Sequence, residues 1–369
     1  MNRLPIRAFL LLASLLLPQV LSAAEPIFAF EPEGKAADLN RGLPADELYY
    51  HPSEELFYGE SWHFLAKLDQ GYVVYSNNLI TNMSLTRPSA AVEFSILAPD
   101  GKVYTSKLEY KKDEIHASTT SYAIRIAKNS LGGEYPHYHF HLEQSGLLVD
   151  LDFENLVPGW KYNSGAIYFG AQRQQHFRYA ISSPNARVKG TLKFAGREVP
   201  VTGYGFQDHS LLNIPATSFS KRWFHLRLLS DPYTIDFTEI ETASEYTPRK
   251  IIYVLVAEGD KIIYQGNQLE LGWSDLVRDD EYGYAWPKTV SVKIEDGNFS
   301  LSGQLHIERL LERIVVLSHL NAMIRSVVYT FVGKPVYYRC LNHADLHISA
   351  GGRTAEIKGE AVNEVVFIK

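Results

Sequence analysis

The chain has 369 residues, of which 46% are hydrophobic, 12% aromatic and 21% charged, with a formal net charge of −6. This balance excludes a disordered, collagen-like or low-complexity protein, and the length suits roughly two domains of about 150 residues each. The single cysteine excludes an internal disulfide and a cysteine-rich zinc site, and an acidic chain without a Lys/Arg cluster is a poor partner for nucleic acid.

Residues 1–24 are predicted to form a secretory signal peptide. Arg3 and Arg7 give a basic start, residues 9–21 are apolar, and Ser-Ala-Ala at 22–24 provides a cleavage site. The apolar run is short for a bilayer, and no later stretch is long and apolar enough to be a transmembrane segment. We therefore expect an exported protein, periplasmic or secreted, in which residues 25–45 form an extended lead-in segment.

The rest of the chain alternates apolar and polar residues with a period of two. Examples are residues 92–96, 149–154 and 290–294. Short turn sequences separate such runs, which predicts an all-β protein of antiparallel sheets, either barrels or sandwiches. A helical pattern is weak everywhere except at residues 304–314, which fit a strand equally well.

An internal repeat indicates two similar domains. The residues that recur at an offset of 161 are Trp62, Leu65, Leu68 and Tyr72, matched by Trp223, Leu226, Leu229 and Tyr233. Further matches follow in the same order, so we predict tandem β-domains at residues 46–208 and 209–369 that are related by duplication.

Residues 179–209 carry the most distinctive pattern in the chain. Tyr-Ala-Ile-Ser-Ser-Pro at 179–184 is followed by Val-Pro-Val-Thr-Gly-Tyr-Gly-Phe-Gln-Asp-His at 199–209. This pattern resembles the signature of a lipocalin-like superfamily that includes carotenoid hydratases (hydroxyneurosporene synthases), AttH-type secreted proteins, fungal lipocalin-like Diels–Alderases and the yeast survival factor linked to ceramide transfer. Residues 60–64 and 221–224 resemble the opening strands of its two domains. The resemblance implies two successive lipocalin-like, calycin-type β-barrels.

Asp208 and His209 are the candidate catalytic pair. In a hydratase, an acid kept neutral by an apolar pocket protonates a carbon–carbon double bond, and Asp208 fits that role. The alternative is that the pair ties a loop to the barrel through hydrogen bonds. Two departures from the hydratase pattern weaken the catalytic interpretation: Phe206 replaces a Tyr, and Arg-Tyr-Ala at 178–180 replaces His-Tyr-Trp.

His137, His139 and His141 are a second candidate site. Residues two apart on a strand share a face, so the three imidazoles could bind a metal ion. The glutamate that completes a cupin-type set is absent, and a solvated polar face is the favoured interpretation. We therefore expect neither a metal nor a cofactor.

The leading hypothesis is an exported binding or transport protein for a hydrophobic small molecule, such as a lipid, isoprenoid or polyketide, held in a barrel or between barrels. The alternative is a hydratase, isomerase or pericyclase that acts on a polyene or terpenoid, with Asp208 as acid or orienting residue. A third is an assembly protein of the envelope. The expected ligand contacts are Trp62, Tyr72, Tyr204, Phe206, Arg222, Trp223, His225 and Trp286.

Overall fold

The computed structural model describes residues 24–32, 39–84, 87–316 and 333–368, together with Ser326 and Tyr329. The predicted signal peptide therefore lies outside the described residues, apart from Ala24. Strands dominate what is described, and α2 (Ala216–Phe219) and the 3-10 turns η1 (Ala45–Leu48) and η2 (Lys112–Glu114) are short. The all-β prediction is confirmed. No helix within the described ranges has the length and apolar character that a membrane span requires.

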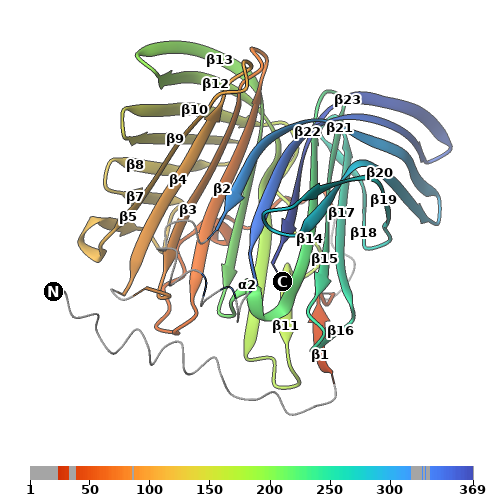
Figure 1. The fold of residues 1–369 in the computed structure, drawn as a ribbon, viewed down its shortest axis with the longest axis horizontal. Helices are drawn as coiled ribbons and strands as arrows, with labels where there is room; N and C mark the ends of the chain where they lie inside the picture. Colours follow the sequence, from red (N-terminus) through yellow and green to blue (C-terminus); the bar gives the residue numbers. More distant parts are fainter. Residues whose placement is uncertain are drawn as a thin grey trace.

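The first sheet curls into a nearly closed barrel (Figure 1). Its strand order is β5-β4-β3-β2-β13-β12-β10-β9-β8-β7-β6. The strands are β2 (Gly59–Leu68), β3 (Val73–Thr81), β4 (Ser89–Leu97), β5 (Val103–Tyr110), β6 (Ile115–Ala117), β7 (Ala123–Ile126), β8 (Asn129–Glu134), β9 (His137–Gln144), β10 (Leu147–Asn155), β12 (Gln175–Phe194) and β13 (Arg197–Leu212). β11 (Ala166–Phe169) pairs with β12, and β1 (Glu25–Ala29) pairs with β11 and with β16 (Tyr246–Thr247).

The second sheet has the order β18-β17-β15-β14-β23-β22-β21-β20-β19. Its strands are β14 (Ser220–Leu229), β15 (Tyr233–Thr242), β17 (Lys250–Glu258), β18 (Lys261–Gly266), β19 (Glu270–Asp279), β20 (Tyr284–Asp296), β21 (Phe299–Val315), β22 (Val336–Ala350) and β23 (Arg353–Phe367). The ambiguous segment 304–314 is a strand, because it lies within β21. The expected joint after Asp208 lies within β13, and the chain leaves the first sheet after Leu212.

Both sheets repeat one topology, which agrees with a duplication. In each sheet, the first strand of a meander pairs with the strand that comes last in the chain. These pairs are β2 with β13 and β14 with β23. The residue match at offset 161 does not hold in space, because Trp62 packs inside the first barrel and Trp223 packs between the sheets. Phe64 and Phe224, an even offset apart, both point into their own barrels. An odd offset exchanges the two faces of a strand.

The apolar residues form three clusters. One fills the first barrel, a second lies inside the second sheet, and a third contains residues of both sheets and joins them. The first barrel is filled largely by phenylalanine rings, namely Phe64, Phe94, Phe140, Phe153 and Phe194. The high aromatic content is therefore mainly a packing feature of the barrel interiors and of the contact between the sheets.

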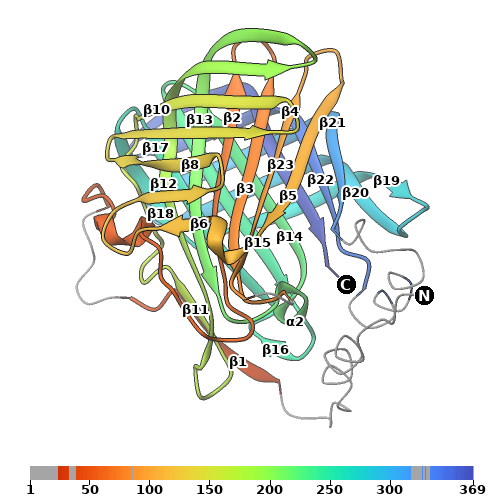
Figure 2. The same cartoon turned by 90° about the vertical axis from the view of Figure 1, so that its left-hand side faces the viewer.

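The lead-in segment contacts both sheets. Asn40 exchanges hydrogen bonds with the backbone of Ile262 in β18, at 2.8 and 3.4 Å. Farther along, Trp62 of β2 donates its indole N–H to the carbonyl of Leu48 at 3.1 Å. Figure 2 shows the first sheet facing the viewer, with the start of the chain running past its lower strands. The described part of the lead-in is thus tied to the barrel rather than hanging free of it.

Candidate functional site

Asp208 lies in a buried polar network between the two sheets. Its carboxylate is 2.7 Å from Nδ1 of His63 and accepts a hydrogen bond from the Tyr179 hydroxyl at 3.2 Å. On the second sheet, Nη2 of Arg227 lies 3.7 Å from the same carboxylate. Asp208 is 2% exposed, so these partners replace water almost completely.

These partners keep Asp208 ionised. Burial by itself would raise the pKa of Asp208, but the neighbouring His63 and Arg227 outweigh burial and hold the pKa below its ordinary value. A general acid for a double bond must be protonated near neutral pH. The site therefore fits an orienting or structural role for Asp208 better than proton donation.

The network continues from Arg227 into the second sheet. Arg227 donates to Glu364 at 2.8 Å, and Arg339 donates to the other oxygen of Glu364 at 2.9 and 3.1 Å. The Arg339 guanidinium lies over the Tyr75 ring of β3, 3.4 Å from its centroid. Cationic side chains of the second sheet thus touch both a carboxylate and an aromatic ring of the first.

His225 extends the network on its far side. It lies 2.8 Å from Nη2 of Arg227 and 2.8 Å from Asp236. The sequence pattern indicated His225 but not Arg227, Arg339 or Glu364. A signal for Arg227 was available, because it falls two residues after His225 and therefore on the face that Trp223 and His225 share.

Asp208→Asn is expected to destabilise the protein by about 2–3 kcal/mol at pH 7, because His63 and Arg227 would face a neutral amide. The charge of Asp208 stabilises the fold above the ordinary aspartate pKa, and this contribution disappears as the pH falls through the lowered pKa of the folded state. The difference between the two proteins should therefore shrink in acid. Urea unfolding at several pH values measures this difference in the free energy of unfolding. A difference that stays constant with pH would contradict the charged network.

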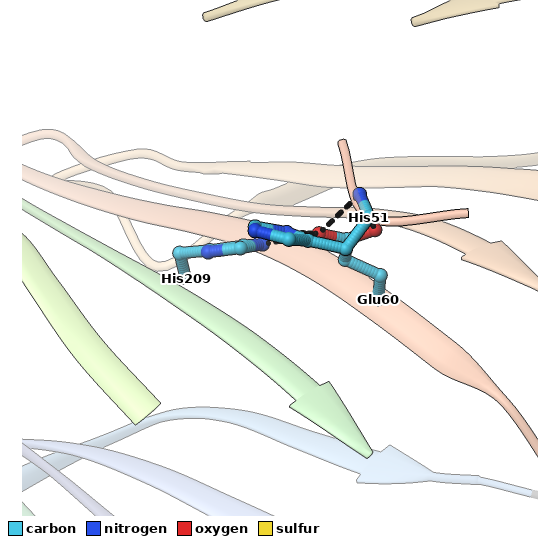
Figure 3. Close-up of side chains that lie close together, drawn as sticks. All are labelled: His51, Glu60 and His209. Atoms are coloured by element: carbon cyan, nitrogen blue, oxygen red, sulfur yellow. Dashed lines mark hydrogen bonds and ion pairs between the residues drawn. The ribbon is translucent and has the colours of Figure 1, made fainter. Parts of the chain in front are cut away.

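His209 does not join Asp208. The two residues point to opposite faces of β13, so the predicted pair is not brought together. His209 stacks on Trp62 with ring centroids 5.0 Å apart, and its Nε2 lies 2.9 Å from a carboxylate oxygen of Glu60 (Figure 3). His51 reaches the same oxygen through Nδ1 at 2.8 Å.

Glu60 is fully buried at the centre of this second cluster. The Tyr58 hydroxyl donates to it at 2.5 Å, and the backbone N–H of His51 donates at 2.9 Å. Burial would raise the pKa of Glu60, but the hydrogen bonds from His209, His51 and Tyr58 lower it to about 2. Glu60 is therefore a carboxylate at neutral pH, held by aromatic and imidazole partners.

The other expected ligand contacts are distributed over three regions. The cluster between the sheets contains or adjoins Tyr204, Phe206, Trp223 and His225. The interior of the first barrel is faced by Trp62 and Tyr72. The interior of the second sheet holds Arg222 and Trp286. Arg222 covers the Trp273 ring at 3.9 Å, and Trp286 stacks near Tyr338. The structure therefore does not gather these residues into one pocket.

The three histidines of β9 lie on its outer face. His139 pairs with Asp152 at 2.9 Å, and His141 pairs with Asp150 at 2.6 Å. His139, His141 and Asp150 are close enough to share an ion, whereas His137 is not part of that group. Their side chains are 50%, 30% and 38% exposed, so water competes for each of these groups.

A cavity of about 510 Å³ lies between the lead-in segment and the first barrel. Its apolar lining comes from Leu43, Pro44, Leu48, Tyr49, Tyr122, Tyr135, Tyr138 and Pro158. Polar groups, including Arg41, Ser121 and Glu134, complete the lining. Tyr135 is 54% exposed, so one large aromatic ring of the lining is partly open to solvent. An apolar lining with a few polar groups is typical of small-molecule sites.

Other hollows on the first barrel are less suited to an apolar ligand. A groove of about 790 Å³ follows β6–β8 and includes His116, Arg125 and His139, and one of about 740 Å³ includes Asp152, Arg187 and Lys189. The larger groove also has apolar lining residues, among them Ala117, Ile124 and Leu131, but both grooves are more open to solvent than the cavity under the lead-in segment. The cavity under the lead-in segment is therefore the best candidate for a hydrophobic molecule among these.

The Svf1 family profile matches residues 59–369. The chain belongs to the Svf1 family. This Svf1-family chain is 25% identical over 241 residues to the ceramide-binding protein SVF1 of Eremothecium gossypii. That alignment covers 60% of this chain and 61% of the relative, so the chain spans about six-tenths of the curated relative it matches.

Solved structures show the same fold. An AttH-like protein of Nitrosomonas europaea matches with a TM-score of 0.61 and 15% identity, over 93% of this chain and 100% of that one. Kievitone hydratase of Nectria haematococca matches with a TM-score of 0.58 and 13% identity, over 92% and 98%. The lipocalin-like fold and the superfamily resemblance drawn from residues 179–209 are thus confirmed for this Svf1 chain.

Proposed function

We propose that this protein binds a lipid of the ceramide class, in which two aliphatic chains join a small amide and hydroxyl head. The observation that carries the proposal is the cavity of about 510 Å³ under the lead-in segment, with its tyrosine-rich lining. Membership of the Svf1 family and the ceramide-binding relative support the choice of ligand class.

The lining suits such a molecule. Leu43, Leu48 and the tyrosine rings offer apolar surface to aliphatic chains. Burial raises the pKa of Tyr138 to about 12, so its hydroxyl stays protonated and available to an amide or hydroxyl head. The lining also holds Arg41 and Glu134, one charge of each sign, and both side chains can hydrogen-bond to the hydroxyl and amide groups of an uncharged lipid head.

The barrel interior is a less suitable place for the lipid. Phe64 stacks on Phe140 there, and both rings meet Phe153 edge to face, with ring centroids 4.7 to 5.9 Å apart and all three side chains buried. A ligand in that space would have to displace packed rings at a cost of several kcal/mol, about 3–5 per Phe by analogy with core deletions. We therefore place the lipid at the edge of the barrel.

Binding rather than turnover is proposed, because hydration of a double bond would require a neutral acid and Asp208 is ionised. We further propose that the protein acts as a carrier outside the cytoplasm, periplasmic or secreted. The support for export is the basic, apolar and small-residue order of residues 1–24.

Native mass spectrometry of the protein purified from its own host, followed by organic extraction, tests both lipid binding and export. We expect one ceramide-class lipid per chain and a protein mass that lacks residues 1–24. A ligand-free protein that also fails to bind added short-chain ceramide would contradict lipid binding. Lipid-loaded protein that still carries residues 1–24 would contradict export but not lipid binding.

A further inference from the structure

His51, Glu60 and His209 meet from three separate parts of the chain. His51 follows the turn η1, Glu60 lies near the start of β2, and His209 lies near the end of β13 (Figure 3). One donor atom from each residue lies within 4.8 Å of the others. Both imidazole nitrogens point at a single oxygen of Glu60, at 2.8 and 2.9 Å.

The two ring nitrogens of His209 have different partners. Its Nδ1 lies 2.5 Å from the backbone carbonyl of Glu47, and a carbonyl only accepts, so Nδ1 carries a hydrogen. Nε2 is therefore the nitrogen that can coordinate an ion, and it lies 2.9 Å from the Glu60 carboxylate, which supplies a negatively charged ligand.

The surroundings orient the donors as in a metal site. A metal-bound histidine commonly donates its other ring N–H to a carbonyl, which is what His209 does toward Glu47. Tyr58 and the His51 backbone hold the second oxygen of Glu60, so that its first oxygen faces the imidazoles. The stacked Trp62 ring fixes the plane of His209. Among its partners in the described chain, Glu60 has no Lys or Arg to neutralise it.

The cluster is open on one side only. Glu60 is 0% and the His209 side chain 6% exposed, whereas the His51 side chain is 35% exposed. A hollow of about 10 Å³ is lined by His51, His209, Arg178 and Tyr179. That is about the volume that one water-sized probe occupies, enough for one small ion or one water molecule.

We propose that His51, Glu60 and His209 bind one divalent transition-metal ion of the Zn²⁺ type. Two imidazoles and one carboxylate, with a fourth position open toward the hollow, form a set that Zn²⁺ commonly accepts. The ion would fasten the stretch that follows η1, through His51, to β2 and β13. Because the residues just before His51, at 40–45 and 48–49, line the cavity, metal binding would hold this side of the cavity in place. The site itself does not depend on which ligand the cavity takes.

Calorimetric titration of the chelator-treated full chain with ZnCl₂ tests the proposal. We expect one ion per chain, at least tenfold weaker affinity in His51→Ala, and unchanged affinity in His139→Ala, which removes a histidine from the exposed cluster on β9. Co²⁺ should give a visible absorption band in the wild type that His51→Ala loses. His51 lies in a partly exposed loop, and an unchanged unfolding midpoint in metal-free His51→Ala would show that the fold is kept.

No saturable binding by the wild type would overturn the proposal. So would equal affinity in His51→Ala, or loss of binding in His139→Ala with His51→Ala unaffected. If His51→Ala unfolds, His51→Gln replaces it, because Gln keeps a side chain of similar reach without the imidazole. Equal Zn²⁺ affinity in that variant also contradicts the site.

Discussion

Replacing Glu364 with Gln is expected to lower the free energy of unfolding by about 3–5 kcal/mol at pH 7. Glu364 accepts hydrogen bonds from Arg227 and Arg339, whose side chains are only 3% and 1% exposed. The substitution keeps the shape of the side chain and leaves two buried guanidinium groups without their shared counter-charge. Urea unfolding at pH 7 measures the loss.

The same substitution has a defined pH dependence. Burial would raise the pKa of Glu364, but Arg339 and Arg227 lower it from 4.5 to about 2. The contribution of its charge is therefore complete above about pH 4.5 and is lost as the pH falls toward 2. The difference in the free energy of unfolding between the wild type and Glu364→Gln should therefore become smaller as the pH falls over that range.

Glu143→Gln provides the matched control. Glu143 pairs with Lys128 at 3.1 Å, but their side chains are 47% and 72% exposed, so the loss should be below about 1 kcal/mol. If Glu364→Gln costs no more than this control, the buried pairs of Glu364 with Arg227 and Arg339 do not stabilise the second sheet as described.

Leu43→Asp is expected to weaken ceramide binding more than tenfold, which is above about 1.4 kcal/mol. Leu43 lines the cavity from the lead-in segment. A carboxylate at this position must lose water when an aliphatic chain enters the cavity, which costs free energy that the wild-type leucine does not. Because Leu43 is only partly buried, the fold should tolerate the change. Titration with a fluorescent short-chain ceramide gives the affinity.

Leu108→Asp is the control for this experiment. Leu108 is 41% exposed on β5 and is not part of the cavity lining, so the variant carries the same added charge elsewhere on the barrel. We expect wild-type affinity for it. Equal affinities in the two variants would place the lipid outside the cavity under the lead-in segment.

The sequence predicts the architecture well because its signals are local. Alternation at 92–96 and 149–154 identifies strands β4 and β10, and the recurring motifs indicate two sheets of one topology. The residues of the internal repeat were paired out of register, because an offset of 161 places Trp62 and Trp223 on opposite faces of their strands. The same alternation also separates Asp208 from His209, so a paired role could have been excluded from the strand pattern alone.

The buried networks were less predictable, because they depend on pairings distant in sequence. Arg227 and Glu364 are 137 residues apart and meet only through the register of β14 with β23. His209 and Glu60 are 149 residues apart and meet only through the register of β13 with β2. The cavity has a similar origin, since its lining combines residues 40–49 with residues between 120 and 182.

In the proposed function, a ceramide-class lipid lies under the lead-in segment. Photolabelling with a ceramide that carries a diazirine in its acyl chain, followed by peptide mass spectrometry, tests it most directly. We predict labels on the cavity lining, at Tyr49, Tyr122 or Tyr138, that excess unlabelled ceramide removes. The claim would be contradicted if the labels that unlabelled ceramide removes lay only in the second sheet or in the contact between the sheets.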